Sequence, residues 1–466
     1  MRAFPPDPGS GVPVSARPGK MPGLSIRAMR CQKGGLHVSR SIKIDKSIAG
    51  YLILLILLIL NDTVGHIGYS VFVLAWAAFL MIAFDPVLMI VPCILTSTIQ
   101  SYFLITPTLS FSRILSLFFI AGYILHRRLI IRKSKETLFL ILFAAYHLLT
   151  VFWSVTGSYS EPVSFAIGIA MIILLGSTRA DDATMARVQT LIYGMCYIFG
   201  LFVVFLTIRL SRQVGESQVV FDESLNANTI CSTLALFISI IYGKLLFKIG
   251  NKLLDYLFIL VCTITILFAG SRTSLIGVLG TIVILPFLNN TNRSFSFKVR
   301  RLLGLTLLLA VIVGTLYYYM SNNTDLYERF TFASTSTKSI DRRVFVWEAL
   351  WKEIIPKNLL IGIGYGIGNV REAVAPYVEM AYHSHNMFLG ILSETGLIGL
   401  AMYLLLYADV IKKALRSINP RMMIAFGMLV TGLLIGIGEE VINRRWFWLA
   451  IGLVFLFDRN RAAERK

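Results

Sequence analysis

Long apolar segments follow one another along almost the whole chain after its first 46 residues. A helix that crosses the hydrocarbon core of a bilayer needs roughly 20 apolar residues, and most of these segments approach that length. Hydrophobic residues make up 56% of the 466 residues and charged residues only 15%, too few to cover the surface of a soluble protein. The sequence therefore predicts an all-α polytopic membrane protein with about 12–14 transmembrane helices.

Candidate spans are defined by apolar length and periodicity. The sixth of them is short for a full crossing. They lie at residues 47–61, 67–84, 86–105, 111–126, 137–156, 162–176, 187–208, 227–247, 253–270, 272–289, 301–319, 386–408, 422–438 and 445–458.

The net charge of the chain is +19, and its basic residues are divided unevenly between the two sides of the membrane. When the N-terminus is placed in the cytoplasm, 31 of the 44 Lys and Arg residues fall in the tails and loops on that side. Cytoplasmic loops carry such an excess, so we predict that both termini are cytoplasmic. No separate basic domain stands apart from the spans, which argues against nucleic acid as a partner and for contact with anionic membrane lipid.

The spans and their orientation divide the chain into four parts. Residues 1–46 are rich in Pro, Gly and Arg and lack an apolar core, which predicts a disordered, basic cytoplasmic tail. Residues 47–319 hold the first transmembrane helices, and residues 320–385 form one long loop on the outer side. Residues 386–466 hold the C-terminal transmembrane helices and a short cytoplasmic tail.

The outer loop at 320–385 is long and hydrophilic, and loops of this kind are usually functional. Within it, residues 342–355 carry apolar side chains at helical spacing, among them Trp347 and Trp351, which predicts an amphipathic helix at the membrane interface. The sequence PKNLLIGIGYGIGN follows and predicts a turn region.

Arginines recur at the outer face of the membrane, where the charge bias of membrane proteins makes them unexpected. An arginine close to hydrocarbon is usually retained for a partner, and its planar guanidinium binds phosphate through two parallel hydrogen bonds. Several converging arginines would suit the diphosphate of a lipid-linked substrate. The alternative is that each extends to lipid head groups or pairs with Glu439, Glu440 or Asp341. The arginines at this face are Arg113, Arg272, Arg342, Arg343, Arg444 and Arg445.

Two of the six histidines, His383 and His385, lie where the outer loop enters the span at 386–408. An imidazole with an ordinary pKa of about 6.5 accepts a proton near neutral pH. Metal binding is the alternative, but no Asp, Glu or Cys accompanies the pair at typical ligand spacing. Glu394 lies inside the same span, where a carboxylate is usually retained for a functional or structural contact. His147 lies inside another span and is interpreted as a hydrogen-bonded core residue.

Four local patterns resemble the superfamily of bacterial O-antigen ligases and polymerases. NANTIC (226–231) resembles the Asn-rich entry to a helix in the middle of the family's chains, and AGSRTSLIGVLG (269–280) resembles the Ser-Arg opening of a later helix. DRRVFVWEALWKEIIPKNLLIGIGYG (341–366) resembles the motif Arg-x-x-x-Trp followed by Pro and Gly-x-Gly. HSHNMFLGILSETGLIGL (383–400) resembles the motif His-Asn-x-x-Leu with a later Glu-x-Gly.

The resemblance implies a GT-C-like glycosyltransferase of the bacterial inner membrane, independent of metal ions and cofactors, with a periplasmic active site. Its donor would be a glycan on undecaprenyl diphosphate. The acceptor would be a sugar hydroxyl, on lipid A–core for a ligase or on the next lipid-linked repeat unit for a polymerase.

The family motifs fall on residues that suit this chemistry. We expect His385 to take the proton from the acceptor hydroxyl, and Arg272 and Arg343 to neutralise the departing diphosphate. The residues expected to contribute to substrate binding are Arg342, His383, Asn386, Glu394 and Arg113.

Three alternatives stay open at the level of the sequence. The motifs do not separate a ligase from a polymerase. A flippase for lipid-linked oligosaccharides would also have many spans and basic loops, although its polar residues would line a cavity at the midplane. A membrane scaffold would use its arginines only as lipid anchors.

Overall fold

The structure is a computed structural model, and its described helices belong to one compact unit, Asp45–Lys466. The predicted tail up to residue 44, most of the predicted span at 301–319, the first part of the outer loop and Arg342 lie outside the described residues. The described ranges are 45–64, 67–100, 102–106, 109–127, 131–214, 227–288, 343–378 and 383–464, with single positions at 299, 303 and 314.

Helices form almost all of the described structure, and most of them match predicted spans to within a few residues. The α-helices are α1 (Lys46–Val64), α2 (Ile67–Ala83), α3 (Ile90–Thr98), α4 (Phe111–Arg127), α5 (Lys135–Leu149), α6 (Ser160–Ser177), α7 (Asp182–Val214), α8 (Ala227–Leu246), α9 (Lys252–Phe268), α10 (Arg272–Leu288), α14 (Asn369–Val374), α15 (Met387–Arg416), α16 (Pro420–Ile435) and α17 (Arg445–Glu464). Short 3₁₀ and π-helical turns are η1 (Pro86–Met89), η2 (Thr150–Trp153), η3 (Leu350–Ile354), η4 (Pro356–Asn358) and η5 (Val441–Asn443).

The third predicted span, 86–105, ends earlier than expected. Its helix stops at Thr98, and a short antiparallel hairpin follows, in which β1 (Leu104–Thr106) pairs with β2 (Leu109–Ser110). The apolar run therefore belongs partly to a strand, and an apolar run alone does not distinguish a short buried strand from a helix end.

Five of the described helices are long and apolar enough to cross a membrane: Lys135–Trp153, Ser160–Ser177, Asp182–Arg209, Asn228–Leu246 and Met387–Arg416. Shorter apolar helices of 10–17 residues accompany them, at Lys46–Leu60, Gly68–Ala83, Pro86–Thr98, Phe111–His126, Arg272–Phe287 and Pro420–Ile435. The chain is an all-α polytopic membrane protein, as predicted. The number of spans stays a prediction, because most of 301–319 lies outside the described residues.

The most deeply packed helices are α8 and α17, which are apolar on nearly every side. α17 packs against α3, α6, α15 and α16, and its residues from Trp446 to Phe457 are buried. A helix without a polar face has to be surrounded by other helices. His147 of α5 also lies in this core, and its Nε2 is 2.8 Å from the hydroxyl of Tyr403. The interpretation of His147 as a core residue is confirmed.

α15 was predicted as one continuous span at 386–408, but its helix is broken at Gly396. The backbone groups that the break releases bond to the glycine-rich segment 359–364 of the outer loop, so they are satisfied inside the protein. Ser393 and Glu394 would otherwise accept from Leu397 and Ile398. The four bonds are Ile363 N–H to Ser393 O (2.9 Å), Gly364 N–H to Glu394 O (2.9 Å), Leu397 N–H to Leu359 O (2.9 Å) and Ile398 N–H to Leu360 O (3.2 Å).

Glycine is required where the two segments meet. Gly362, Gly364 and Gly396 all have positive φ, and a Cβ on any of them would lie within 2.4 Å of a backbone atom of another segment. The predicted turn region therefore packs directly against the break in α15 and joins the outer loop to that helix.

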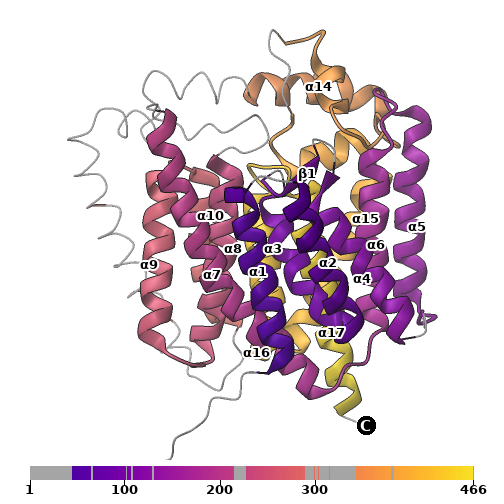
Figure 1. Ribbon diagram of the computed structural model, residues 1–466. Coiled ribbons are helices and arrows are strands. Elements are labelled where there is room, and N and C mark those ends of the chain that lie inside the picture. The colour runs from indigo at the N-terminus through magenta and orange to yellow at the C-terminus, as the bar shows by residue number, and fades with distance from the viewer. Residues whose placement is uncertain are drawn as a thin grey trace, which may run out of the picture. The chain divides into compact units, whose positions relative to one another are not determined.

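Figure 1 shows α14, which belongs to the outer loop, beyond one end of the helices, whereas the C-terminal end of α17 lies at the opposite end. The end nearer to α14 holds the starts of α10 and α15 and the loop between α16 and α17, which together position the candidate site.

Candidate functional site

The turn from His383 to Asn386 leads into α15. Asn386 is the N-cap of that helix, and its Oδ1 accepts a hydrogen bond from the N–H of Leu389 at 3.0 Å. Its Nδ2 donates to the carbonyl of Ile437, 3.1 Å away, in the loop between α16 and α17. Asn386 therefore starts α15 and ties its first turn to that loop.

Ser384 is the buried centre of this turn. Glu440, in the loop between α16 and α17, accepts hydrogen bonds at Oε1 from the Ser384 N–H (2.8 Å) and hydroxyl (2.6 Å). On the other side, the indole N–H of Trp347 donates to the Ser384 carbonyl at 2.6 Å. The Oε2 of Glu440 also lies 3.9 Å from Nδ1 of the half-exposed His383. Two separate elements thus hold the turn in place.

His385 follows Ser384 and has a left-handed backbone, with φ of 47°, which is rare for a residue with a Cβ. Burial, and next the charge of Arg343, lower the pKa of His385 to about 4, while the charge of Glu440 acts in the opposite direction. At neutral pH the imidazole is therefore uncharged, and its lone pair is available to a proton.

Two arginines lie near this turn. Arg343 opens the described part of the outer-loop helix, which is α-helical over 343–349 and continues as η3. Arg272 opens α10, and its guanidinium is close enough to that of Arg343 for the two charges to repel each other. Like charges held together and partly buried are unfavourable on their own, so this arrangement favours an anionic ligand.

Glu439 lies next to this pair of arginines. Burial raises its pKa to about 7, and the charges of Arg444 and Arg343 oppose the shift. The side chain is buried, and its Oε1 has no hydrogen-bond partner among the described residues. Burial likewise lowers the pKa of Arg343, and Glu439 opposes that change. Glu439 and Arg343 therefore interact, but neither neutralises the other completely.

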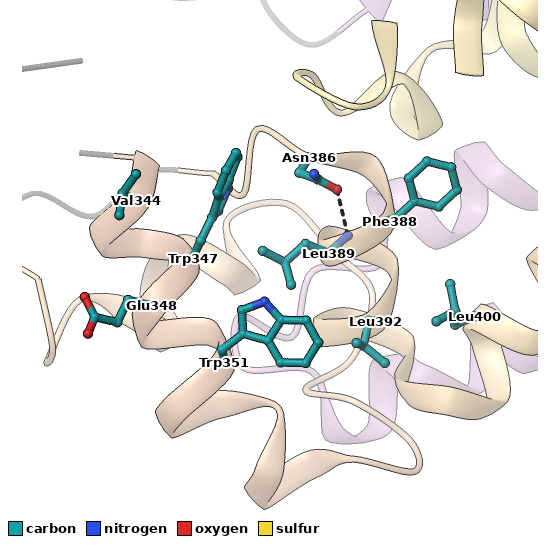
Figure 2. A pocket seen from close by; sticks show the side chains of 9 residues that line it. All are labelled: Val344, Trp347, Glu348, Trp351, Asn386, Phe388, Leu389, Leu392 and Leu400. Carbon is teal, nitrogen blue, oxygen red and sulfur yellow. Dashed lines mark hydrogen bonds between the residues drawn. The ribbon is translucent and has the colours of Figure 1, made fainter. Parts of the chain in front are cut away.

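An apolar groove of about 470 Å³ runs between the outer-loop helix and α15. Figure 2 shows Trp347 and Trp351 on one wall and Leu389 and Leu392 on the other, with Asn386 at one end. Of the predicted amphipathic face, Val344, Trp347 and Trp351 line the groove. Leu350 and Ile354 of the same predicted face are instead buried in the protein, together with Val346 and Ala349.

A second charged group is made of residues from α4, α6 and α15. Glu161 of α6 interacts with Glu440 and with Arg113 of α4. Glu394 of α15 interacts with Glu440 and Glu161, and its carboxyl group accepts a hydrogen bond from the N–H of Gly366. Carboxyl groups gather here, although no group of three or more possible ligands is arranged to hold a metal ion within the described residues.

The other two outer arginines have clear structural contacts. Arg444 donates to the hydroxyl of Thr229 at 2.8 Å. Arg445 is buried and donates to the hydroxyls of Ser112 (3.3 Å) and Ser164 (2.8 Å). For Arg445, therefore, contact with lipid head groups does not apply.

The structure thus places Arg343 within electrostatic reach of both Arg272 and His385, and His383 and Asn386 lie in the same turn as His385. Arg113 and Glu394 lie in the neighbouring charged group, and the predicted contact of Arg342 lies outside the described residues. Glu439, which the sequence offers as a partner for arginines, interacts with Arg343 and Arg444. The contacts between Ser384 and Glu440 are not predicted by the sequence, where Glu440 is offered only as a partner for arginines.

Residues 257–404 match the model of the O-antigen ligase family. The matched region runs from α9 through the outer-loop helix into α15, so it contains Arg272, Arg343 and His385. No curated protein matches the chain. This match covers about a third of the chain and supports its resemblance to the superfamily of O-antigen ligases and polymerases.

Proposed function

We propose that this multi-pass membrane protein of glycosyltransferase type moves a glycan from undecaprenyl diphosphate to a sugar hydroxyl, without a metal ion, at the periplasmic face of the bacterial inner membrane. The observation that carries the proposal is that the charge of Arg343 acts on both Arg272 and His385. The three come from distant parts of the chain, because Arg272 begins α10, Arg343 is the first described residue of the outer-loop helix and His385 precedes α15. A proton acceptor near a pair of arginines suits a transfer in which an anion leaves.

The arginines act on the leaving group of the reaction, the diphosphate. As the bond between the anomeric carbon and the diphosphate oxygen breaks, its electron pair stays with the diphosphate. Arg272 and Arg343 are placed to bind that growing negative charge, and each guanidinium offers two parallel donors to phosphate oxygens. Their mutual repulsion in the free protein is relieved when the anion binds. Arginines would then do what a magnesium ion does at many phosphate sites.

His385 acts on the nucleophile, the acceptor hydroxyl. The acceptor oxygen bonds to the anomeric carbon, and its proton passes to the imidazole. Since burial and Arg343 lower the pKa of His385 to about 4, the ring is neutral and ready to accept that proton at pH 7. General-base help of this kind contributes roughly 10²–10⁴-fold to the rate.

The apolar groove supports a donor that is attached to a lipid. It is lined by Val344, the residue after Arg343, and by Asn386, the residue after His385. A lipid whose diphosphate lies at the arginines can therefore extend its hydrocarbon chain directly into the groove. Cavities of roughly 300–1,000 Å³ with mainly apolar walls are typical of ligand sites.

The orientation of the chain belongs to the same proposal. The cytoplasmic termini, the tail at 1–46 and the periplasmic loop at 320–385 are supported by the positive-inside count and by the position of α14 at the end opposite the C-terminus (Figure 1). A flippase is less well supported, because the charged groups gather where helices begin rather than at the middle of a span.

Glycan transfer in membranes tests the proposal. We expect His385→Ala, Arg272→Lys and Arg343→Lys, at matched protein levels, to lower transfer by about 10²-fold or more. Arg371→Lys is the matched control, because Arg371 is an exposed arginine of α14 and should tolerate the same exchange. Transfer close to normal in all three site variants would exclude this mechanism.

A deletion strain separates the two acceptors. Single repeat units left on the lipid would indicate a lost polymerase, and long chains left on the carrier lipid would indicate a lost ligase. Extracted glycans on a gel show the difference directly.

A further inference from the structure

Glu440 contacts the histidine turn at three points, although it was expected only as a partner for arginines. Its Oε1 accepts from the Ser384 N–H at 2.8 Å and from the Ser384 hydroxyl at 2.6 Å. Its Oε2 lies 3.9 Å from Nδ1 of His383, and about a fifth of the side chain (21%) is exposed. The Glu440 carboxylate therefore binds Ser384, which lies between the two histidines.

We propose that Glu440 is a positioning residue for the proton acceptor, because it fixes the left-handed turn at His385 and places a negative charge near the imidazole. The inference rests on the proposed function, since it concerns how His385 acts during glycan transfer.

The left-handed backbone of His385 depends on the contacts of its neighbours. A left-handed backbone costs about 1 kcal/mol or more for a residue with a Cβ, so it persists only where neighbours determine it. The neighbours of His385 are both tied to the loop between α16 and α17, Ser384 through Glu440 and Asn386 through Ile437. Removing the Glu440 carboxylate would remove the hydrogen bonds that hold Ser384, one of the two neighbours.

The charged groups around His385 also point to Glu440. The groups that face His385 are Arg343 from the outer-loop helix, Glu440 from the loop between α16 and α17, and His383 from its own turn. When His385 accepts a proton it becomes a cation beside Arg343, which is unfavourable in a buried place. Among these three groups, Glu440 is the one whose charge favours that cation. The groups that act on or contact Glu440 in turn are Glu161 of α6, Glu394 of α15, Tyr365 of the outer loop, His383 and Ser384.

The rate of transfer should depend on pH through His385. His385 works only in its neutral form, so transfer falls as the pH drops through the pKa of His385, about 4. Glu440 raises that pKa. Loss of its charge should therefore move the acid limb of the pH profile to lower pH, and should also slow transfer at pH 7, because a weaker base assists less.

The experiment compares three variants in the purified full-length chain. Glu440→Gln keeps an acceptor oxygen for Ser384 but removes the charge, so we expect transfer at pH 7 to fall about 3- to 10-fold and the acid limb to move down. Ser384→Ala keeps the charge but loosens the turn, so we expect a lower rate with an unmoved acid limb. Glu372→Gln removes an exposed carboxylate of α14 and should change neither.

A second readout does not depend on activity. Diethyl pyrocarbonate modifies neutral imidazole, so the pH dependence of its reaction at His385, followed by mass spectrometry, reports the protonation of that ring. In Glu440→Gln the midpoint should move to lower pH.

The outcomes separate the two proposals. If His385→Ala abolishes transfer while Glu440→Gln keeps the normal rate and the normal acid limb, the role of Glu440 is wrong and the proposed function stands. If Glu440→Gln is slower but neither the limb nor the modification midpoint moves, Glu440 is only a structural residue and the inference is overturned. If His385→Ala transfers normally, both proposals fail.

Discussion

Two groups of buried charges lie at different ends of α8 and are paired in different ways. α8 begins beside Arg444, which bonds to Thr229, and it ends near Lys244, about 22 Å further along at 1.5 Å per residue. At that far end, Nζ of Lys244 lies 2.7 Å from Oδ1 of the fully buried Asp255. The hydroxyl of Tyr197 also donates to Asp255, and Lys244 donates to Tyr197 at 2.8 Å.

At the near end, opposite charges also interact, Glu439 with Arg343 and Glu161 with Arg113, but like charges stand beside them. Arg272 repels Arg343, and Glu440 interacts with two further carboxyl groups, those of Glu161 and Glu394. Glu439 lies between arginines, yet one of its oxygens has no described partner.

The comparison separates two uses of buried charge. The opposite pair shares a hydroxyl, leaves little net charge and joins α8 to α9, so its task is structural. Oδ2 of Asp255, like Oε1 of Glu439, has no hydrogen-bond partner among the described residues, so the difference between the two ends lies in the charges. Like charges side by side are unfavourable in the free protein and are retained where a ligand of opposite charge completes them. Stability and activity should therefore respond in opposite ways when charges are removed at the two ends.

Removing a site arginine tests this contrast with the largest expected effect. Arg343→Met keeps most of the apolar stem but removes the guanidinium, so we expect transfer to fall by about 10²–10³-fold. Because the repulsion from Arg272 is lost as well, the thermal midpoint of the detergent-purified protein should stay equal or rise. A variant that melts at clearly lower temperature but still transfers glycan would assign Arg343 to the structural class.

Removing half of the far pair should do the reverse. Asp255→Asn leaves Lys244 buried with no opposite charge, which we expect to lower the free energy of unfolding by about 3–5 kcal/mol. Transfer per folded molecule should remain within about two-fold, since the pair lies far from the site. Lys244→Met combined with Asp255→Leu is the control and should recover most of the lost stability, as measured by thermal melting. A large loss of transfer in well-folded Asp255→Asn would contradict the comparison.

Much of the fold could be predicted because apolar length is a local property. The spans at 162–176 and 422–438 correspond to α6 and α16 with shifts of only a few residues. The break in α15 could not be predicted in this way. The segment at 386–408 is uniformly apolar, and the partners that stabilise its break lie in residues 359–364, which are not adjacent in the sequence.

The candidate site shows the same division. Arg272, Arg343 and His385 could be proposed from the sequence because arginine and histidine are unusual at the end of a span. Glu440 could not be given its role, because its partner Ser384 lies 56 positions earlier in the chain and serine carries no distinctive signal. Pairing between distant segments is a property of the packed structure, which residue type alone does not reveal.

Glu439 offers a subtler test, since its pKa of about 7 lies near the working pH. Above that pH the carboxylate is ionised and competes with the donor diphosphate for Arg343, whereas below it the carboxyl is neutral. We expect the KM for the donor to rise about five-fold between pH 6 and pH 8, which corresponds to about 1 kcal/mol between neighbouring charges. Glu439→Gln should bind the donor equally well at both pH values. A KM that depends on pH in the same way in wild type and variant would show that another group titrates.

The smallest effect is expected in the groove, which touches neither group of charges. Trp351 is 58% exposed and lines the groove opposite Leu392 (Figure 2). If the donor's hydrocarbon chain lies there, Trp351→Ala removes apolar contact worth about 0.6 kcal/mol and should raise the KM for a long-chain donor about three-fold, with little change in kcat. Trp351→Phe should restore most of the affinity. A donor with a chain too short to reach Trp351 should bind wild type and variant equally, because the diphosphate contacts at Arg343 are intact in both. Equal KM values with the long-chain donor would place the lipid chain elsewhere, while the arginines and His385 would keep their assigned roles.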